Sequence, residues 1–431
     1  MPTRAADCST LEGSGVAMNI VIIGLNFAPE LTGVGKYTGE MASWFASRGH
    51  RVKVITTEPY YPHWKTPSRK CWTWRRERWQ GCDVIRCPLY VPRSVSAGKR
   101  IVHLGSFALS SIPAALGQIA AGKIDVVASI VPTLLTAPLA LGLARLTRAQ
   151  AWIHYQDLEI DVANGSDFIG PSRALKAAQA FERAVLKKAD LVSAVSPKML
   201  EAIGQKGVCR DRLMLFPNWV DTSRIFPSAP PTEMRRELHI DDETCVALYS
   251  GSIGHKQGLE CVIAAARLFA DAGNRSIVFV IAGAGPARAE LEQKAKGLPN
   301  VIFLPLQPEE QLNAFLNLAD IHLLPQRRSA TDLVMPSKLG AMLATGRPVI
   351  ATVMEDSQVA LTLEGAGLVV PPENPEALAA AINVLTGNAD HRRSLGRRGL
   401  MTAKRSMEAT VVLQNAEQRL LALPGLQHAA A

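Results

Sequence analysis

The chain has 431 residues, of which 48% are hydrophobic and 20% charged, and a net charge of +9. This length favours two domains of roughly 200 residues each, because a single α/β core seldom grows so large. The composition is ordinary for a globular protein and excludes a collagen-like or fully disordered chain. The seven cysteines show no metal-ligand spacing and are odd in number, which argues against a zinc site or a disulfide framework and favours the cytoplasm.

The positive charge is concentrated in the first half of the chain. Residues 1–215 hold 27 lysines and arginines against 16 aspartates and glutamates, whereas the remainder holds 20 against 22. This asymmetry indicates that the first half meets an anionic partner. A lipid surface and a phosphorylated acceptor fit this charge better than nucleic acid, because no nucleic-acid-binding motif accompanies it.

The alternation of strands and helices begins at Met18. Residues 1–17 lack the charged and apolar regions of a signal peptide, so we expect a disordered extension there. Two apolar stretches, 101–122 and 124–146, are interrupted by prolines and polar residues. We therefore expect buried strand and helix segments in both, and no membrane span.

The first elements form a βαβ unit. The continuous apolar run over 19–26 predicts a parallel strand buried on both faces, followed by a helix over 37–48 and a strand over 52–56. A glycine-containing loop stands between the first strand and the helix, and we predict a phosphate or sugar contact there, with a plain loop as the alternative. The candidate acceptor-binding residues in it are Gly33, Gly35 and Lys36.

The stretch 65–80 interleaves three tryptophans with arginines and lysines. Tryptophan rings at headgroup depth beside cationic side chains are typical of a surface that binds an anionic membrane. A hairpin that packs its tryptophans into the core and turns its arginines to water is the alternative.

Polar residues follow the predicted strand 151–155. His154 lies in that strand, and Asp157 and Glu159 come just after its carboxyl end. Because ligands of open α/β sheets bind at the carboxyl ends of parallel strands, these side chains are candidate site residues. A structural histidine within the core is the alternative for His154.

The second half contains the junction that organises the prediction. A strand over 245–249 runs into a glycine-rich turn and then into a helix at Leu259, while a proline, a hydroxyl and an ammonium precede a second predicted helix over 339–344. Glycine turns that lead into helices can aim unpaired backbone N–H groups at an anion. We expect the two junctions to hold a diphosphate between them, although two ordinary turns with solvated lysines remain the alternative. The candidate donor-binding residues are Gly251, Ser252, Gly254, Lys256, Ser337 and Lys338, with Gly283 and Gly285 after the strand 277–282.

These motifs, in this order, resemble the family 4 retaining glycosyltransferases from Met18 to about Leu420. The residues that carry the resemblance are Gly33–Lys36, Pro217–Asp221, Tyr249–Gly254, Ala282–Pro286, Pro336–Leu339 and Ala344–Val349. Within the family, Asn26–Glu40 and Pro59–Pro62 are similar to the colanic acid biosynthesis transferases of bacterial exopolysaccharide assembly.

The resemblance implies a GT-B fold, in which two Rossmann-like α/β domains with doubly wound parallel sheets face each other. The implied limits are 18–225 for the acceptor-binding domain, 226–405 for the donor-binding domain and 406–431 for a helix that crosses back to the first domain. The proline-rich segment Phe226–Pro231 marks the linker between the domains. The resemblance also implies a nucleotide sugar as donor and no metal or other cofactor, because cationic groups and a helix N-terminus stabilise the leaving diphosphate.

The chain departs from the family pattern at several site positions. Ser252 stands where an arginine is usual, Gln257 where a lysine is usual, and Leu333 and Ala341 where two glutamates are usual. The usual sugar-binding carboxylates are therefore not transferable. We expect Lys338 and Lys256 to take over the charge of the diphosphate, and Asp332 to reach the sugar.

The sequence thus predicts a glycosyltransferase that acts with retention, with His154, Asp157, Asp332 and Lys338 as catalytic candidates. The implied donor is GDP-fucose, and the implied acceptor is an undecaprenyl-diphosphate-linked oligosaccharide at the inner face of the cell membrane. A nucleotide-sugar epimerase and a non-catalytic sugar-nucleotide-binding scaffold are the alternatives. A dinucleotide oxidoreductase is disfavoured, because neither glycine loop has the three-glycine spacing followed by an acidic residue.

Overall fold

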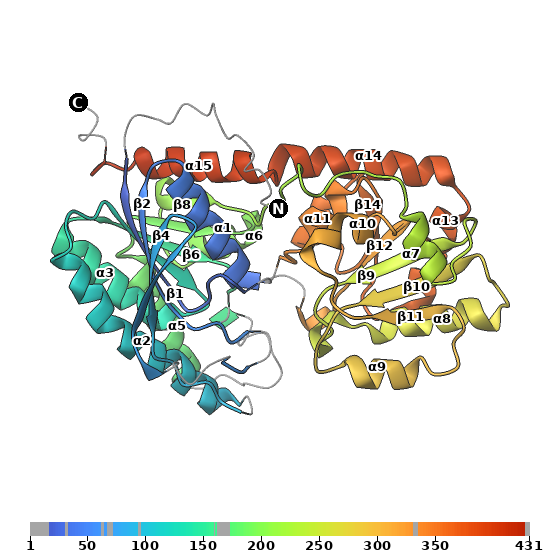
Figure 1. The fold of residues 1–431 in the computed structure, drawn as a ribbon, viewed down its shortest axis with the longest axis horizontal. Helices are drawn as coiled ribbons and strands as arrows, with labels where there is room; N and C mark the ends of the chain where they lie inside the picture. Colours follow the sequence, from blue (N-terminus) through green and yellow to red (C-terminus); the bar gives the residue numbers. More distant parts are fainter. Residues whose placement is uncertain are drawn as a thin grey trace, which may run out of the picture.

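The computed structural model describes residues 17–30, 33–61, 64–66, 72–93, 96–158, 160–161, 173–330 and 335–426. Within these ranges the chain forms two α/β units that stand side by side, each built on its own sheet (Figure 1). We call them the first and the second domain. The predicted fold class, two doubly wound parallel-sheet domains, is confirmed. The predicted N-terminal extension lies, except for Ala17, outside the described residues.

The first domain is built on a sheet with the strand order β3-β4-β2-β1-β5-β6-β7-β8, in which only the β3–β4 pairing is antiparallel. Its strands are β1 (Asn19–Gly24), β2 (Arg51–Thr57), β3 (Arg75–Trp79), β4 (Cys82–Cys87), β5 (Val126–Val131), β6 (Gln150–Tyr155), β7 (Leu191–Ala194) and β8 (Leu213–Leu215). Its helices are α1 (Gly33–Ser47), α2 (Ala97–Ile119), α3 (Ala137–Thr147), α5 (Arg173–Leu186) and α6 (Pro197–Gln205).

The second domain is built on an all-parallel sheet with the order β11-β10-β9-β12-β13-β14. Its strands are β9 (Cys245–Ser250), β10 (Ile277–Ala282), β11 (Val301–Leu304), β12 (Ile321–Pro325), β13 (Val349–Thr352) and β14 (Gly367–Val370). Its helices are α7 (Thr232–Glu237), α8 (Glu260–Asp271), α9 (Arg288–Lys294), α10 (Leu312–Leu316), α11 (Leu339–Ala344), α12 (Gln358–Thr362), α13 (Pro375–Thr386) and α14 (Ala389–Ser406), and the chain ends in α15 (Ala409–Leu421).

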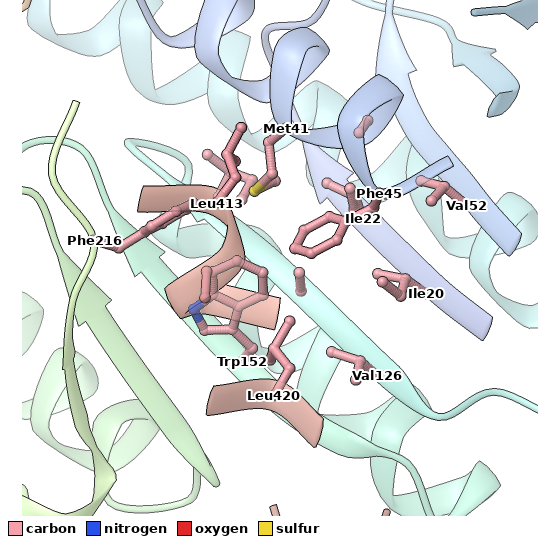
Figure 2. Packing of buried hydrophobic residues seen from close by; sticks show 14 of the residues in the cluster. Ile20, Ile22, Met41, Phe45, Val52, Val126, Trp152, Phe216, Leu413 and Leu420 are labelled. Atoms are coloured by element: carbon pink, nitrogen blue, oxygen red, sulfur yellow. The ribbon is translucent and has the colours of Figure 1, made fainter. Parts of the chain in front are cut away.

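Both faces of the first sheet are buried, as the continuous apolar run predicts. Alternate residues of β1 enter opposite clusters: Ile20 and Ile22 join one, and Val21 and Ile23 join the other. Figure 2 shows the first of these clusters, in which Ile20 and Ile22 lie near Trp152 of β6 and Phe45 of α1. Because the strands of this sheet are held on both faces, the loops at their carboxyl ends start from a rigid base.

The last two helices run along the same side of both domains (Figure 1). α14 packs against α11 of the second domain, whereas Leu413 and Leu420 of α15 enter the first domain's cluster (Figure 2). Glu417 of α15 accepts a hydrogen bond from His50 Nε2 at 2.7 Å and lies 3.3 Å from Arg48 Nη2. The C-terminal helix therefore ties the second domain to the first.

Three expectations about elements differ from the structure. The loop expected at Gly33–Lys36 is the first turn of α1, which begins four residues earlier than predicted. The stretch 101–122 is largely helical, as α2, but it is not buried throughout, because one face of α2 is exposed. No helix is predicted over 389–406, where α14 lies, because this stretch is strongly charged and has few apolar residues.

Candidate functional site

The strand order of the second sheet reverses between β9 and β12. The strands that follow β9 in the chain extend to one side, and those that follow β12 extend to the other. In open parallel sheets, ligands bind at the carboxyl ends of the strands beside such a reversal. Here these ends lead into Gly251 and Gln326. The candidate donor site is therefore at this edge of the second sheet.

Lys338 reaches this edge from the turn before α11. Its Nζ lies 3.7 Å from the ring centroid of Tyr249 in a cation–π contact. A Cβ on Gly251 would stand 3.3 Å from the same Nζ, so the missing side chain of this glycine leaves room for the ammonium group. The structure thus brings together Gly251 and Lys338, which lie far apart in the sequence.

Tyr249 is a site residue that the sequence analysis missed. Besides lying against the Lys338 ammonium, it donates a hydrogen bond from its hydroxyl to the carbonyl oxygen of Ser252 at 2.5 Å. One buried side chain therefore positions both the cation and the turn after β9. In the sequence Tyr249 is only an apolar strand residue, and no local signal marks its contact with Lys338.

The ammonium of Lys338 is held in an unusual environment. Burial lowers the pKa of Lys338 to about 7, although part of its side chain is exposed. Among the described residues no carboxylate forms an ion pair with it. A cation that is desolvated and has no anionic partner gains more from an incoming anion than a solvated surface lysine does.

Gly283 and Gly285 follow β10 and lie against the turn after β9. A Cβ on Gly283 would overlap the carbonyl oxygen of Gly251, and one on Gly285 would overlap that of Ile253. Their residue type is explained by this close approach of two backbone segments. The sequence predicts both glycines as donor-binding residues, and the structure places them after β10, the neighbour of β9, against the backbone of Gly251 and Ile253.

The expectation of unpaired backbone N–H groups in this turn is wrong for three residues. Gly251 N–H donates to Ala282 O at 3.0 Å, and Ile253 N–H donates to Ala284 O at 2.9 Å. Gly254 N–H donates to the Gln257 side chain at 3.1 Å, and a 3-10 turn at His255–Gln257 separates the glycines from α8. These amides hold the turn in shape and are not free to bind an anion.

The remaining donor candidates surround this centre. Ser252 and Lys256 are exposed, and the carbonyl oxygen of Lys256 accepts a hydrogen bond from Arg327 N–H at 3.1 Å. Ser337 is exposed too, and its carbonyl oxygen accepts a hydrogen bond at 3.0 Å from the hydroxyl of Tyr37 in α1. This last contact joins the donor junction directly to the first domain.

Gln326 is a second residue that sequence reasoning missed. It follows β12 and is buried, and its Oε1 has no hydrogen-bond partner within the described part of the chain. A buried amide oxygen without a partner is costly unless something donates to it. Its place after β12, beside the strand reversal, makes Gln326 a further candidate residue of the donor site.

On the first domain, the predicted acceptor residues lie at the start of α1. Gly35 packs against Glu30, whose carboxylate would overlap a Cβ at this position. Lys36 is half-buried, and its Nζ lies 3.7 Å from the Glu40 carboxylate. Gly33 begins the helix with a positive φ of 63°, which a glycine adopts without strain.

The carboxylate of Glu30 is satisfied by its own domain. It accepts hydrogen bonds from Asn26 Nδ2 at 2.9 Å, Tyr60 N–H at 3.2 Å and Tyr61 N–H at 3.1 Å. Burial nevertheless raises the pKa of Glu30, against the lowering effect of these donors. A carboxylate at this position disfavours a phosphate next to Gly35, so a neutral sugar hydroxyl is the better match for this turn.

His154 lies inside the core of the first domain. It is 2% exposed, its Nδ1 is 2.9 Å from Ser193 Oγ, and its Nε2 is 2.9 Å from the Gln156 side chain. Burial lowers the pKa of His154 to about 3, so the ring is neutral at pH 7. The structure therefore gives His154 no direct access to a substrate, and Gln156 stands between it and the carboxyl end of β6.

Of the other catalytic candidates, Asp157 lies just beyond β6 and is partly exposed. Glu159 and Asp332 lie outside the described residues. In the described ranges, no group of three or more histidine, cysteine, aspartate or glutamate side chains could hold a metal ion.

The comparisons with known proteins agree with this architecture. The family profile "Glycosyl transferase 4-like domain" matches residues 32–219, and "Glycosyl transferases group 1" matches residues 244–388. WcaI of Escherichia coli K12, whose name assigns it to colanic acid biosynthesis as a glycosyl transferase, is 42% identical over 376 residues, which span 85% of this chain and 91% of that protein.

Two solved structures share the fold. Sucrose-phosphate synthase from Thermosynechococcus elongatus has a TM-score of 0.74 at 20% identity, covering 96% of this chain and 100% of that one. Anabaena Alr3699/HepE in complex with UDP has a TM-score of 0.67 at 14% identity, covering 94% and 100%. At these identities the likeness supports the GT-B fold alone.

The two parallel-sheet α/β domains, together with the two matching family profiles, identify a glycosyltransferase of the GT-B class. The chain belongs to the group 1, or family 4, glycosyltransferases, which are retaining enzymes.

Proposed function

We propose that this enzyme transfers a sugar from a nucleotide-sugar donor to a lipid-linked oligosaccharide, with retention, during the assembly of an exopolysaccharide. The observation that carries the proposal is the Lys338 ammonium, which lies against the Tyr249 ring and beside Gly251 at the strand reversal of the second sheet. The similarity to WcaI supports exopolysaccharide assembly as the setting.

We propose that Lys338 binds the diphosphate of the donor. In the transition state negative charge develops on the departing diphosphate, and a preorganised cation in a desolvated site stabilises it strongly. Tyr249 keeps the ammonium in place, because its ring contacts the cation and its hydroxyl holds the neighbouring turn. Lys256 and Ser252 are exposed beside this centre and complete the proposed donor site.

Retention without an identified carboxylate nucleophile favours attack from the same face as the leaving group. In this mechanism the departing diphosphate accepts the proton of the acceptor hydroxyl, the bond to the diphosphate oxygen breaks and the new glycosidic bond forms. Positioning and electrostatics then carry the rate. Asp157 and Asp332 remain the proposed polar contacts to the sugars, and His154 acts by positioning Gln156.

The acceptor is proposed to bind at the first turn of α1, at Gly33, Gly35 and Lys36. Tyr37 of the same turn contacts Ser337 in the donor junction, so the two proposed sites adjoin. We propose an undecaprenyl-diphosphate-linked oligosaccharide at the cytoplasmic face of the membrane. The basic first half of the chain suits the diphosphate of such a lipid.

The donor is proposed to be GDP-fucose, on the resemblance to the colanic acid transferases. UDP sugars are the second choice, because the Anabaena neighbour is described in complex with UDP. A thermal-shift panel of nucleotide sugars separates these options, since a ligand at 100 times its dissociation constant stabilises a protein by about 2.7 kcal/mol.

Product analysis by NMR then tests the reaction. A retained anomeric configuration in a product that requires the acceptor supports the proposal. Conversion of the nucleotide sugar without any acceptor would instead indicate an epimerase. Binding of a donor without turnover, across a panel of lipid-linked acceptors, would indicate a scaffold.

A further inference from the structure

Helix α2 exposes an apolar face along its whole length. Six large apolar side chains on it are exposed, with Leu109 at 70% as the extreme. They are Ile101, Val102, Leu109, Ile112, Leu116 and Ile119. At 100° per residue these positions share one side of the helix, and no charged residue lies among them. An apolar face of this extent on a water-exposed helix is unusual and indicates an interaction surface.

The opposite face of α2 contains polar residues. His103, Ser111 and Gln118 are buried against the domain. His103 Nδ1 is 2.6 Å from Tyr90 O, Ser111 Oγ donates to Ala108 O at 2.9 Å, and Gln118 Nε2 donates to Ala114 O at 2.9 Å, so each of these side chains has a partner on the inner side. Surface helices of globular proteins normally place their polar residues outside. In α2 several polar residues are buried and large apolar residues are exposed, which indicates that the exposed face contacts something other than water.

Trp74 adjoins α2, and Trp72 stands two residues before Trp74 in the chain. Trp72 and Trp74 are 64% and 54% exposed, and Trp74 Nε1 donates to Ser110 O of α2 at 2.9 Å. A groove of about 420 Å³ lies between the β3–β4 hairpin and α2, and its lining includes Trp74, Arg76 and Pro113. The predicted membrane-binding stretch 65–80 therefore lies beside α2 at Trp74 and Arg76, and the two can form one surface. Residues 67–71 of this stretch lie outside the described ranges.

The charge around this face is positive. No aspartate or glutamate occurs between Asp83 and Asp125 in the sequence. Five exposed cationic residues belong to this region of the domain: Arg76, Arg93, Lys99, Arg100 and Lys123. Lys99 and Arg100 lie in the first turn of α2, at one end of the apolar face.

We propose that the apolar face of α2, together with Trp72 and Trp74, docks the first domain onto an anionic bilayer. An apolar helix face between tryptophans and cations has the composition of segments that lie in the headgroup region. No helix in the described part of the chain is long and apolar enough to cross a membrane, so the contact lies in the plane of the surface. This inference deepens the proposed function, on which it rests, by stating how the enzyme meets a lipid-linked acceptor.

The test is vesicle co-sedimentation of the full chain, with phosphatidylcholine vesicles that contain or lack phosphatidylglycerol. We expect the chain to sediment with the anionic vesicles, and less so at high salt. The double variant Leu109→Gln/Leu116→Gln should bind these vesicles at least about tenfold more weakly, because two of the six apolar contacts are lost. The matched control Val384→Gln/Met401→Gln changes two exposed apolar residues of the second domain and should bind like the unaltered chain.

The proposal is overturned if the unaltered chain stays in the supernatant with anionic vesicles, or if both double variants bind equally. Light scattering that shows a dimer, broken by Leu109→Gln/Leu116→Gln, would assign the face to a second copy instead. Circular dichroism checks that the variants fold.

Transfer to a water-soluble acceptor analogue separates this inference from the proposed function. It should be unchanged in Leu109→Gln/Leu116→Gln if only docking is lost. Vesicle binding without transfer from any donor would overturn the proposed function and leave the docking surface intact.

Discussion

The two domains carry similar strand-to-helix junctions with opposite charge. After β1, a carboxylate, Glu30, fills the space beside Gly35, and three donors of the first domain satisfy it. After β9, an ammonium, Lys338, fills the space beside Gly251, with a tyrosine ring as its neighbour. The carboxylate of the first junction has its partners within its own domain, whereas we propose that an anion of the donor completes the second junction. The comparison teaches that a glycine turn predicts room for a ligand, but the side chain beside it decides the ligand's charge.

The largest effect is expected from the cation of the second junction. Lys338→Ala should lower turnover roughly 10²–10³-fold, the usual cost of removing one donor to developing charge. Steady-state kinetics with the donor found by thermal shift measure this. Lys294→Ala is the matched control, because Lys294 is an exposed lysine of the same domain that pairs with Glu290. Activity of Lys338→Ala within twofold of the unaltered enzyme would remove Lys338 from this role.

The second effect concerns the backbone behind the junction. Gly283→Ala should destabilise the chain by about 1–3 kcal/mol or more, because the added Cβ overlaps the Gly251 carbonyl oxygen at a φ of 147°. It should also weaken donor binding. Urea unfolding and calorimetry measure the two quantities. Gly142→Ala in α3, where a Cβ would meet open space, should be neutral or stabilising; equal losses for both variants would contradict the packing argument.

The third effect is a pH dependence of donor binding. The Lys338 pKa of about 7 in the free enzyme means that the ammonium is formed below pH 7, and a bound diphosphate should raise this pKa. Donor affinity should therefore be constant below about pH 7, and above pH 7 it should fall by up to about tenfold for each pH unit. Calorimetric titrations across this range measure it.

An arginine at the same position supplies the control for that titration. Arginine stays charged throughout the range, so any binding that Lys338→Arg retains should be independent of pH. A flat profile for the unaltered enzyme would contradict the assignment. The stability of the free protein should change with pH in the opposite direction to donor affinity. Because the pKa of Lys338 in the folded state lies below the usual lysine value of 10.5, the free energy of unfolding should increase as pH rises from 7 to 10.5.

A smaller effect is expected from Tyr249. Tyr249→Leu removes the ring beneath the ammonium. Turnover should fall roughly 3–30-fold, because a cation–π contact contributes about 0.5–2 kcal/mol. Tyr249→Phe keeps the ring and loses the hydrogen bond to Ser252, so it should retain more activity. The pH at which donor affinity begins to fall should also move in Tyr249→Leu. A positioning role is excluded if that pH stays the same and both variants are equally impaired.

The smallest effect on donor binding is expected from the first junction. Glu30→Gln should change donor affinity by less than about twofold, because the carboxylate belongs to the other domain and is satisfied there. Its effect should appear in the KM for the acceptor and in stability. A large loss of donor affinity, with the KM for the acceptor unchanged, would contradict the division of the two sites.

Much of the fold follows from local patterns in the sequence. The bounds of β10 and α11 agree with the predicted ranges, because a short apolar run between turn residues identifies a buried parallel strand and the helix after Lys338 is strongly apolar. The charged helix α14 has few apolar residues, and it is stabilised mainly by packing onto α11 and α13. Only tertiary structure could reveal it.

The residues of the candidate site likewise include some that local sequence signals indicate and some that only tertiary contacts reveal. The sequence indicates Gly251 and Lys338, since glycines and a lysine at turns are local signals. The role of Tyr249 depends on a contact between positions that are distant in the chain, and the place of His154 depends on the burial of its ring by Phe216 and Trp152. Neither burial nor a distant contact is encoded in spacing, so a histidine at a strand end resembles a site residue until the core around it is known.

The central claim is that Lys338 and the Gly251 turn hold the diphosphate of the donor. A crystal structure of the enzyme with GDP or UDP tests it most directly. The account predicts a diphosphate oxygen about 3 Å from Lys338 Nζ, beside Gly251 and over the edge where β9 and β12 end. A nucleotide bound elsewhere, with Lys338 still resting on Tyr249 and no phosphate near it, would contradict the account.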